Sequence, residues 1–200
     1  MGNPTGETRV QPVTGTPVAA SEAYVYEAEN RILSRTDVIA GMTAYAHDEN
    51  GNRVQDVDPT ASHTQVFDAR NLMVARDGPG GTVLHAYDGD GRRVRRTENG
   101  TETRYVLDTT PALFQVLQQT DANGTAYASH VYGLGLISTI DTAGNRSVYH
   151  HDRQGNTIAV TNAAGAVTLA YEYDPFGELI AASGPRIPFL FLGAYGVMDE

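Results

Sequence analysis

The chain of 200 residues contains no cysteine and no tryptophan. The absence of cysteine excludes a disulfide framework and thiol chemistry. Lysine and arginine number 14 against 24 aspartates and glutamates, so the formal net charge is −10 at pH 7. This acidic balance argues against nucleic acid or an anionic membrane surface as the main partner. The sequence also lacks a run of about 18 apolar residues, the length that a membrane-spanning helix needs.

The first residues give no targeting signal. The opening stretch "MGNPTGETRVQPVTG" has no basic region followed by an apolar one, so no signal peptide is visible. Residues 1–20 are rich in Gly, Pro and Thr and are expected to form a flexible lead-in. Over the whole chain, 21 glycines and 11 tyrosines favour short strands and turns over long helices.

A bulky residue followed by an acidic one recurs at intervals of 20 to 22 residues, with one gap of 44 residues. The gap holds a degenerate unit at Tyr132-Gly133. A fixed period of this length is the signature of a repeat architecture. The seven occurrences are Tyr26-Glu27, His47-Asp48, Phe67-Asp68, Tyr87-Asp88, Leu107-Asp108, His151-Asp152 and Tyr173-Asp174.

The spacing within each unit is typical of a tight turn. In "YDGDG", "HDRQG" and "YDPFG", Asp and Gly occupy positions i and i+3, where the carboxylate can accept backbone N–H groups and Gly can adopt positive φ. Asn71 replaces Gly in one unit, and Pro175 stands at position i+1 of another. The residues predicted to build these turns are Tyr26, Glu27, Asp48, Gly51, Phe67, Asp68, Tyr87, Asp88, Gly91, Asp108, Asp152, Gly155, Tyr173, Asp174 and Gly177.

Each unit is predicted to be a β-hairpin of about 20 residues, because a strand, a second Gly-containing turn and a return strand follow each acidic turn. A single hairpin cannot bury its apolar face alone. The sequence therefore predicts an all-β fold in which tandem hairpins over residues 21–183 form a curved, spiral antiparallel sheet. Tyr87, Asp88, Gly91 and Val94 mark the best-formed unit.

These units resemble the YD repeats of the RHS family, which includes bacterial RHS proteins, insecticidal toxin-complex C subunits and the teneurins. The motifs that carry the resemblance are "YDGDGRRV", "HDENGNRV", "YEAENRIL" and "YDPFGELI", together with the tail that ends in "PFLFLGAYG". The resemblance extends over residues 22–196. It implies a β-sheet shell, which in bacterial members encloses a variable C-terminal toxin.

The resemblance also makes residues 184–200 the start of the family's core-associated segment. The second DPxG motif, at which the family cleaves itself, is not found, so the chain is expected to be a fragment or a truncated member without that activity. The apolar run "IPFLFL" would normally pack under later sequence. Without such cover we expect it to be exposed and prone to association.

Several other patterns are candidates for a functional site. His150 and His151 are neighbours in a strand and should point to opposite faces, which disfavours a metal site. "DENGN" and "DGDG" have Gly at the fourth position, as a turn requires, and not at the sixth, as a calcium loop requires. "GLGLIS" lacks the third Gly of a dinucleotide fingerprint, and "RRVRR" most resembles a solvated strand face with Arg93 and Arg95 on one side. No catalytic, cofactor-binding or metal-binding residue is predicted.

The sequence therefore predicts a non-enzymatic structural module without a cofactor. By resemblance, its partners are the remainder of an RHS shell and an enclosed C-terminal effector, in a secreted or cell-surface bacterial protein. The alternative is a surface adhesion module that binds glycan or a cell-surface protein through exposed repeat tyrosines. An open aromatic platform would favour adhesion, whereas tyrosines buried in a ladder would not.

Overall fold

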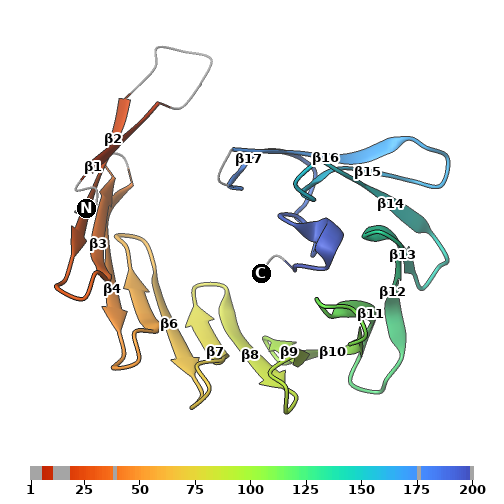
Figure 1. Cartoon of the computed structure of the whole chain (residues 1–200), viewed down its shortest axis with the longest axis horizontal. Coiled ribbons are helices and arrows are strands. Elements are labelled where there is room, and N and C mark those ends of the chain that lie inside the picture. Colours follow the sequence, from red (N-terminus) through yellow and green to blue (C-terminus); the bar gives the residue numbers. More distant parts are fainter. Residues whose placement is uncertain (1–5, 11–18, 38–39, 175–176, 199–200) are drawn as a thin grey trace. The chain divides into compact units, whose positions relative to one another are not determined.

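A computed structural model describes residues 6–10, 19–37, 40–174 and 177–198 (Figure 1). These residues contain 17 β-strands and one short 3₁₀ helix, η1 (Gly193–Tyr195). The strands are β1 (Gly6–Val10), β2 (Ala19–Tyr26), β3 (Ile32–Asp37), β4 (Gly41–His47), β5 (Arg53–Val57), β6 (Ser62–Phe67), β7 (Met73–Gly78), β8 (Gly81–Tyr87), β9 (Arg93–Glu98), β10 (Thr101–Asp108), β11 (Gln115–Thr120), β12 (Ala126–Tyr132), β13 (Leu136–Asp141), β14 (Arg146–His151), β15 (Thr157–Thr161), β16 (Val167–Tyr173) and β17 (Leu179–Ser183).

The chain divides into two compact units. Unit 1 comprises Met1–Ala86 and Thr97–Thr101, and unit 2 comprises Tyr87–Arg96 and Glu102–Glu200. In unit 1 each strand from β1 to β8 pairs antiparallel with the next, and in unit 2 the same holds from β10 to β17. The predicted all-β array of tandem antiparallel hairpins is therefore confirmed.

The register shifts by one residue where most strands enter the acidic turn, as between Ala46 and His47 or between Glu172 and Tyr173. Such a bulge accompanies a turn whose last residue is left-handed, because that residue adds one position to one strand. The repeated Asp-to-Gly spacing thus sets both the turn and the strand register.

Strand β1 was not predicted from the sequence. Its residues lie within the stretch expected to be a flexible lead-in, and they pair antiparallel with Ala19–Ala23 of β2. At the other end of the repeats, β17 ends at Ser183. The expected domain boundaries stay predictions.

Unit 2 contains the main hydrophobic core. Tyr105, Val116, Leu136 and Phe189 form one buried cluster, with Tyr149 among the half-buried side chains packed against it. In Figure 1 the strands from β11 to β17 curve around the residues that follow β17. Among the described residues, no helix is long and apolar enough to cross a membrane.

Candidate functional site

Each repeat places its acidic side chain at the start of a turn. At Asp48, the backbone N–H groups of Asn50 and Asn52 donate to Oδ1 over 3.0 and 2.8 Å, and the N–H of Gly51 donates to the Asp48 carbonyl over 3.1 Å. Gly51 has a φ of 85°, which a residue with a side chain rarely adopts. The same two contacts to one side-chain oxygen recur at Asp68, Asp88, Asp121, Asp141, Asp152 and Asn162.

These hydrogen bonds favour the charged carboxylate. The pKa of Asp48 is lowered, first by the side-chain hydrogen bond from Asn52 and then by backbone N–H groups, which together outweigh partial burial. The pKa of Asp88 is lowered by the backbone N–H of Arg92 first, with further help from the Arg92 side chain. Because both oxygens are occupied inside the turn, these carboxylates serve as structural acceptors.

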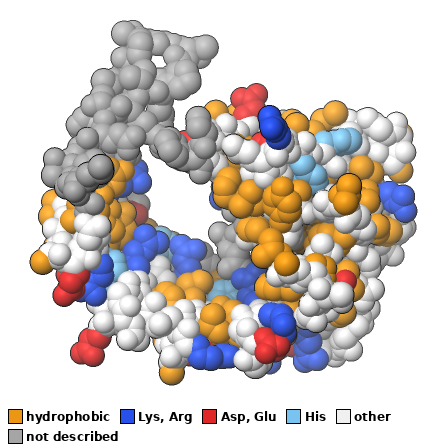
Figure 2. Space-filling model, viewed as in Figure 1, with side chains coloured by type: hydrophobic (Ala, Val, Ile, Leu, Met, Phe, Trp, Pro, Cys, Tyr) orange, Lys and Arg blue, Asp and Glu red, His pale blue; other side chains and the backbone are white. Residues whose placement is uncertain are grey.

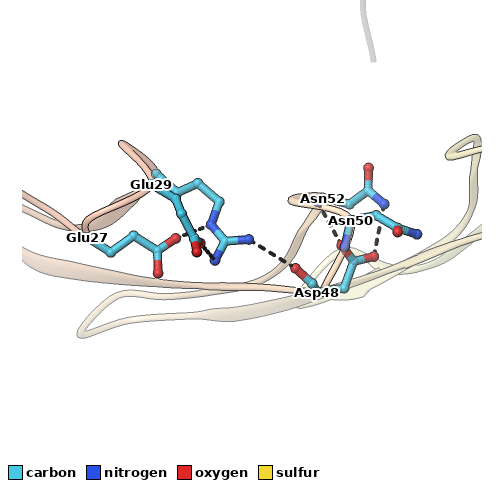
Figure 3. Close-up of polar contacts among 6 residues, drawn as sticks. Glu27, Glu29, Asp48, Asn50 and Asn52 are labelled. Carbon is cyan, nitrogen blue, oxygen red and sulfur yellow. Dashed lines mark hydrogen bonds and ion pairs between the residues drawn. The ribbon is translucent and has the colours of Figure 1, made fainter.

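Consecutive turns of unit 1 are joined along one edge of the sheet. The guanidinium of Arg31 pairs with Glu27 and Glu29 in its own turn and donates to the carbonyl oxygen of Asp48 in the next turn over 3.3 Å (Figure 3). Asn52 then donates to the side-chain oxygen of Asn71, one repeat further on, over 2.9 Å. In these two repeats, the residue that follows the turn therefore connects one hairpin to its neighbour.

The predicted turn residues do not converge on one site, because each hairpin carries its own set. The left-handed conformation expected at Asn71 and Gly91 is confirmed by φ values of 60° and 81°. Asp108 differs from the other turn acids, since it accepts the backbone N–H of Thr110 in a longer loop that lacks the glycine. The predicted role of Pro175 lies outside the described residues.

The turn between β14 and β15 binds the C-terminal segment, defined as residues 185–198. This docking site was not predicted from the sequence. The N–H of Thr157 donates to the Leu190 carbonyl over 2.9 Å, and its hydroxyl donates to the Phe189 carbonyl over 2.8 Å. Asn156 accepts the N–H of Leu192 over 3.0 Å, and Gly155 accepts that of Ala194 over 3.0 Å.

The docked segment buries two of its apolar side chains completely. Phe189 is 0% exposed and Leu190 is 1% exposed. The Phe189 ring meets His130 edge-on at 4.9 Å between ring centroids and meets Tyr149 edge-on at 6.4 Å. The expectation that "IPFLFL" is left exposed is therefore wrong for Phe189 and Leu190, because the repeats themselves supply the apolar surface that covers them, whereas Phe191 stays 37% exposed.

One signal in the sequence could have suggested this docking. Five residues after the turn acid, Thr157 is small and polar, and its side chain is fully buried. The equivalent residues in the other regular units are long, namely Ile32, Arg53, Met73, Arg93 and Leu179. A short hydroxyl side chain leaves room for a backbone to approach and can bond to its carbonyl.

Beside the docked segment lies a cavity of about 270 Å³ with mostly apolar walls. The guanidinium of Arg93 lies over the ring of Tyr105 at 5.4 Å, and burial is the main cause that lowers the pKa of Arg93. In the view of Figure 2, hydrophobic side chains gather on one face of unit 2. The cavity is lined by Arg93, Tyr105, Leu113, Phe114, Val116, Tyr195, Gly196, Val197 and Met198.

The other candidate sites have structural environments. His150 is exposed and bonds to Thr161 over 3.0 Å, whereas His151 is half-buried and stacks on Tyr149. Across the described part of the chain, no group of three or more His, Cys, Asp or Glu side chains is arranged to hold a metal ion. "GLGLIS" contains a tight turn in which Gly133 donates to the Gly135 carbonyl over 2.8 Å.

Comparison with known proteins places these hairpins in a family. A family model described as Teneurin YD-shell matches residues 14–200. The tRNA nuclease WapA of Bacillus subtilis (strain 168) and the tRNA3(Ser)-specific nuclease WapA of Bacillus spizizenii are each 31% identical to this chain over 139 residues. The match covers 66% of this chain and 6% of each relative, so the chain spans a small part of their length.

Among solved structures, the crystal structure of TcdB2-TccC3-Cdc42 is similar over 84% of this chain and 14% of the matched chain, with 14% identity and a TM-score of 0.30. The family assignment rests on the family model, which spans nearly the whole chain, and on the repeated hairpins themselves. The chain belongs to the Teneurin YD-shell family, as a structural module built from YD-repeat hairpins.

Proposed function

We propose that this chain is a non-enzymatic part of a shell wall that encloses or presents an effector carried by the same secreted polypeptide. The observation that carries this proposal is the docking of the C-terminal segment in unit 2. There, Phe189 and Leu190 are buried while the strands curve around the segment (Figure 1). A sheet that turns one face toward its own chain is suited to covering further polypeptide. In this proposal residues 1–20 lead into repeats at 21–183, and residues 184–200 begin a core-associated segment.

The relatives support the proposal that the shell wall and the effector are separate parts of one polypeptide. The WapA proteins are named tRNA nucleases, but the stretch that resembles this chain is only 6% of their length. In this chain the recurring carboxylates, such as Asp88 and Asp152, accept backbone N–H groups in turns. We therefore place any toxic activity outside this stretch, and we place the chain at or beyond the cell surface.

The tyrosines give little support to an adhesive function. Tyr105 and Tyr171 are 8% and 3% exposed, and among the described tyrosines only Tyr127 and Tyr195 are exposed, at 38% and 45%. These two lie on different elements and form no ladder. A glycan-binding platform needs open aromatic faces, so enclosure is the function that we propose.

The test is protection of the effector in the native polypeptide that contains this chain. Trypsin should leave the effector intact there and digest the same effector when it is expressed alone. In Gly155→Val, digestion of the enclosed effector should be at least about 10-fold faster, since Gly155 has a φ of 93° and a Cβ there would lie 2.5 Å from the Tyr195 ring.

Gly89→Ala is the matched control, because a Cβ at Gly89 meets nothing within 4 Å. It should protect the effector as the wild type does. An effector that is cut equally fast inside the native polypeptide and alone contradicts enclosure. A native polypeptide that carries no domain besides the repeats would contradict it as well.

A further inference from the structure

Phe189 packs against a row of hydrogen-bonded side chains from three strands. His130 of β12 bonds through Nδ1 to the hydroxyl of Thr139 on β13 over 2.8 Å, and this hydroxyl donates to the Tyr149 hydroxyl on β14 over 3.3 Å. A threonine hydroxyl carries one proton. Since Thr139 gives its proton to Tyr149, it must accept from His130, so Nδ1 of His130 carries the hydrogen.

The other ring nitrogen of His130 is then a bare acceptor. His130 is 7% exposed, and its Nε2 is buried without a hydrogen-bond partner. A second proton would place an unpaired N–H and a positive charge at this buried position, beside the Phe189 ring. Burying an unpaired charge costs several kcal/mol, so protonation opposes the docked arrangement.

The ionisable groups that surround this ring do not offset such a charge. Residues 185–198 contain no Asp or Glu, and Tyr132 on the same strand and Tyr149 and His151 on β14 carry no negative charge at neutral or mildly acidic pH. Strand β11 has no ionisable side chain, and Asp141 at the end of β13 is held by its own turn. Burial alone lowers the pKa of His130 to about 4.

We propose that His130 and Phe189 form an acid-sensitive latch, through which acidification releases the C-terminal segment from unit 2 while the hairpins stay paired. The latch is a property of unit 2 and does not depend on the proposed enclosure of an effector. The hairpins withstand the same acidification because the pKa of their turn carboxylates, as at Asp48 and Asp152, is lowered below the ordinary value. The segment and the strands therefore respond to acid in different pH ranges.

The sign of the effect follows from the direction of the shift. With a pKa of about 4 when docked and 6.5 when released, His130 has no effect on docking above about pH 7. Docking weakens as pH falls from 6.5 toward 4, because only the released state binds the proton. Between about pH 8 and about pH 4.5 the opening equilibrium of the segment should rise about 75-fold.

Hydrogen exchange of the 200-residue chain, corrected for the intrinsic effect of pH, measures this opening at the amides of Leu192 and Ala194. In the wild type these amides should lose protection over this range, while those of β4 to β7 stay protected. His130→Asn keeps a donor toward Thr139 but cannot be protonated, so its protection should not depend on pH. His150→Asn is the control, since His150 is exposed on β14 and should leave the pH dependence unchanged.

An NMR titration of the wild-type imidazoles keeps the test decisive if His130→Asn fails to fold. The proposal predicts that the docked His130 ring titrates near 4, well below its ordinary value of 6.5, while protection already falls as pH drops below 6.5. It is overturned if His130 titrates near 6.5, if His130→Asn keeps the wild-type pH dependence, or if segment and strands open together. None of these outcomes bears on effector protection, which trypsin digestion of the native polypeptide reports separately.

Discussion

Removal of the Phe189 ring is the most direct perturbation of the docked segment. The side chain is 0% exposed, and its ring contacts those of His130 and Tyr149. Truncation of a fully buried Phe to Ala costs about 3–5 kcal/mol, as the sum of lost transfer energy and the cavity left behind. The backbone hydrogen bonds to Asn156 and Thr157 remain, so Phe189→Ala should weaken docking by about this amount without changing the turn itself.

The assay is the free energy of opening, measured by hydrogen exchange at the amides of Thr157, Leu192 and Ala194. Because stability in repeat arrays is largely local, these amides should lose about 3–5 kcal/mol of protection, and strands β3 to β6 should lose little. Phe191→Ala is the matched control, since Phe191 is 37% exposed, and it should cost less than half as much. Equal losses in both variants, or a loss under about 1 kcal/mol for Phe189→Ala, would refute burial of Phe189 as the anchor.

Two further predictions concern the turns. Gly91→Val should lower the free energy of unfolding in urea by at least about 1–2 kcal/mol, because Gly91 has a φ of 81°, whereas Gly89→Ala should change it little. Equal effects would mean that the conformation of Gly91 carries no strain for a side chain. The lowered pKa of Asp48 and Asp88 predicts stabilisation that is fully present above about pH 4 and lost as pH falls through their folded values. Circular dichroism during acid titration should show loss of strand signal only below about pH 4, and this loss should depend less steeply on pH in Asp48→Asn. Loss of strand signal already at about pH 6 would contradict the stabilising role of these carboxylates.

The sequence was most informative where the structure is local. Asp and Gly three positions apart fix a turn through contacts within five residues, so the periodic spacing predicted the hairpins and their left-handed positions. Asn71 was recognisable for the same reason, because asparagine tolerates positive φ better than other residues with a side chain. These features depend on the backbone and on short-range hydrogen bonds.

The docked segment could not be predicted in this way. Thr157 and Phe189 are 32 residues apart, and no local pattern states which surface an apolar run will cover. The apolar run "IPFLFL" indicated that these residues need cover, but we expected later residues to supply it. Strand β1 was missed for a related reason, because its residues have no strand pattern of their own and gain order by pairing with β2.

The difference between the units lies in one register position. In each hairpin that ends in an acidic turn, the residue three positions before the turn acid pairs with a residue on the next strand. The degenerate unit without a turn acid has an equivalent position. In unit 1 those paired residues are Arg35, Asp56 and Arg76. In unit 2 they are Gln119, Thr139, Val160 and Ala182.

A phenylalanine can be buried against neutral positions, but against the charged ones it would strip water from a guanidinium or a carboxylate at a cost of several kcal/mol. In unit 1 the polar pairing is satisfied within the sheet, since Gln65 donates to Asp56 over 2.8 Å and His63 lies 3.2 Å from the same carboxylate. The neutral residues of unit 2 leave Tyr149 and His130 free to meet an aromatic ring edge-on. The repeated turn motif therefore builds every hairpin, and the residue opposite each core aromatic decides whether that hairpin can cover an apolar segment.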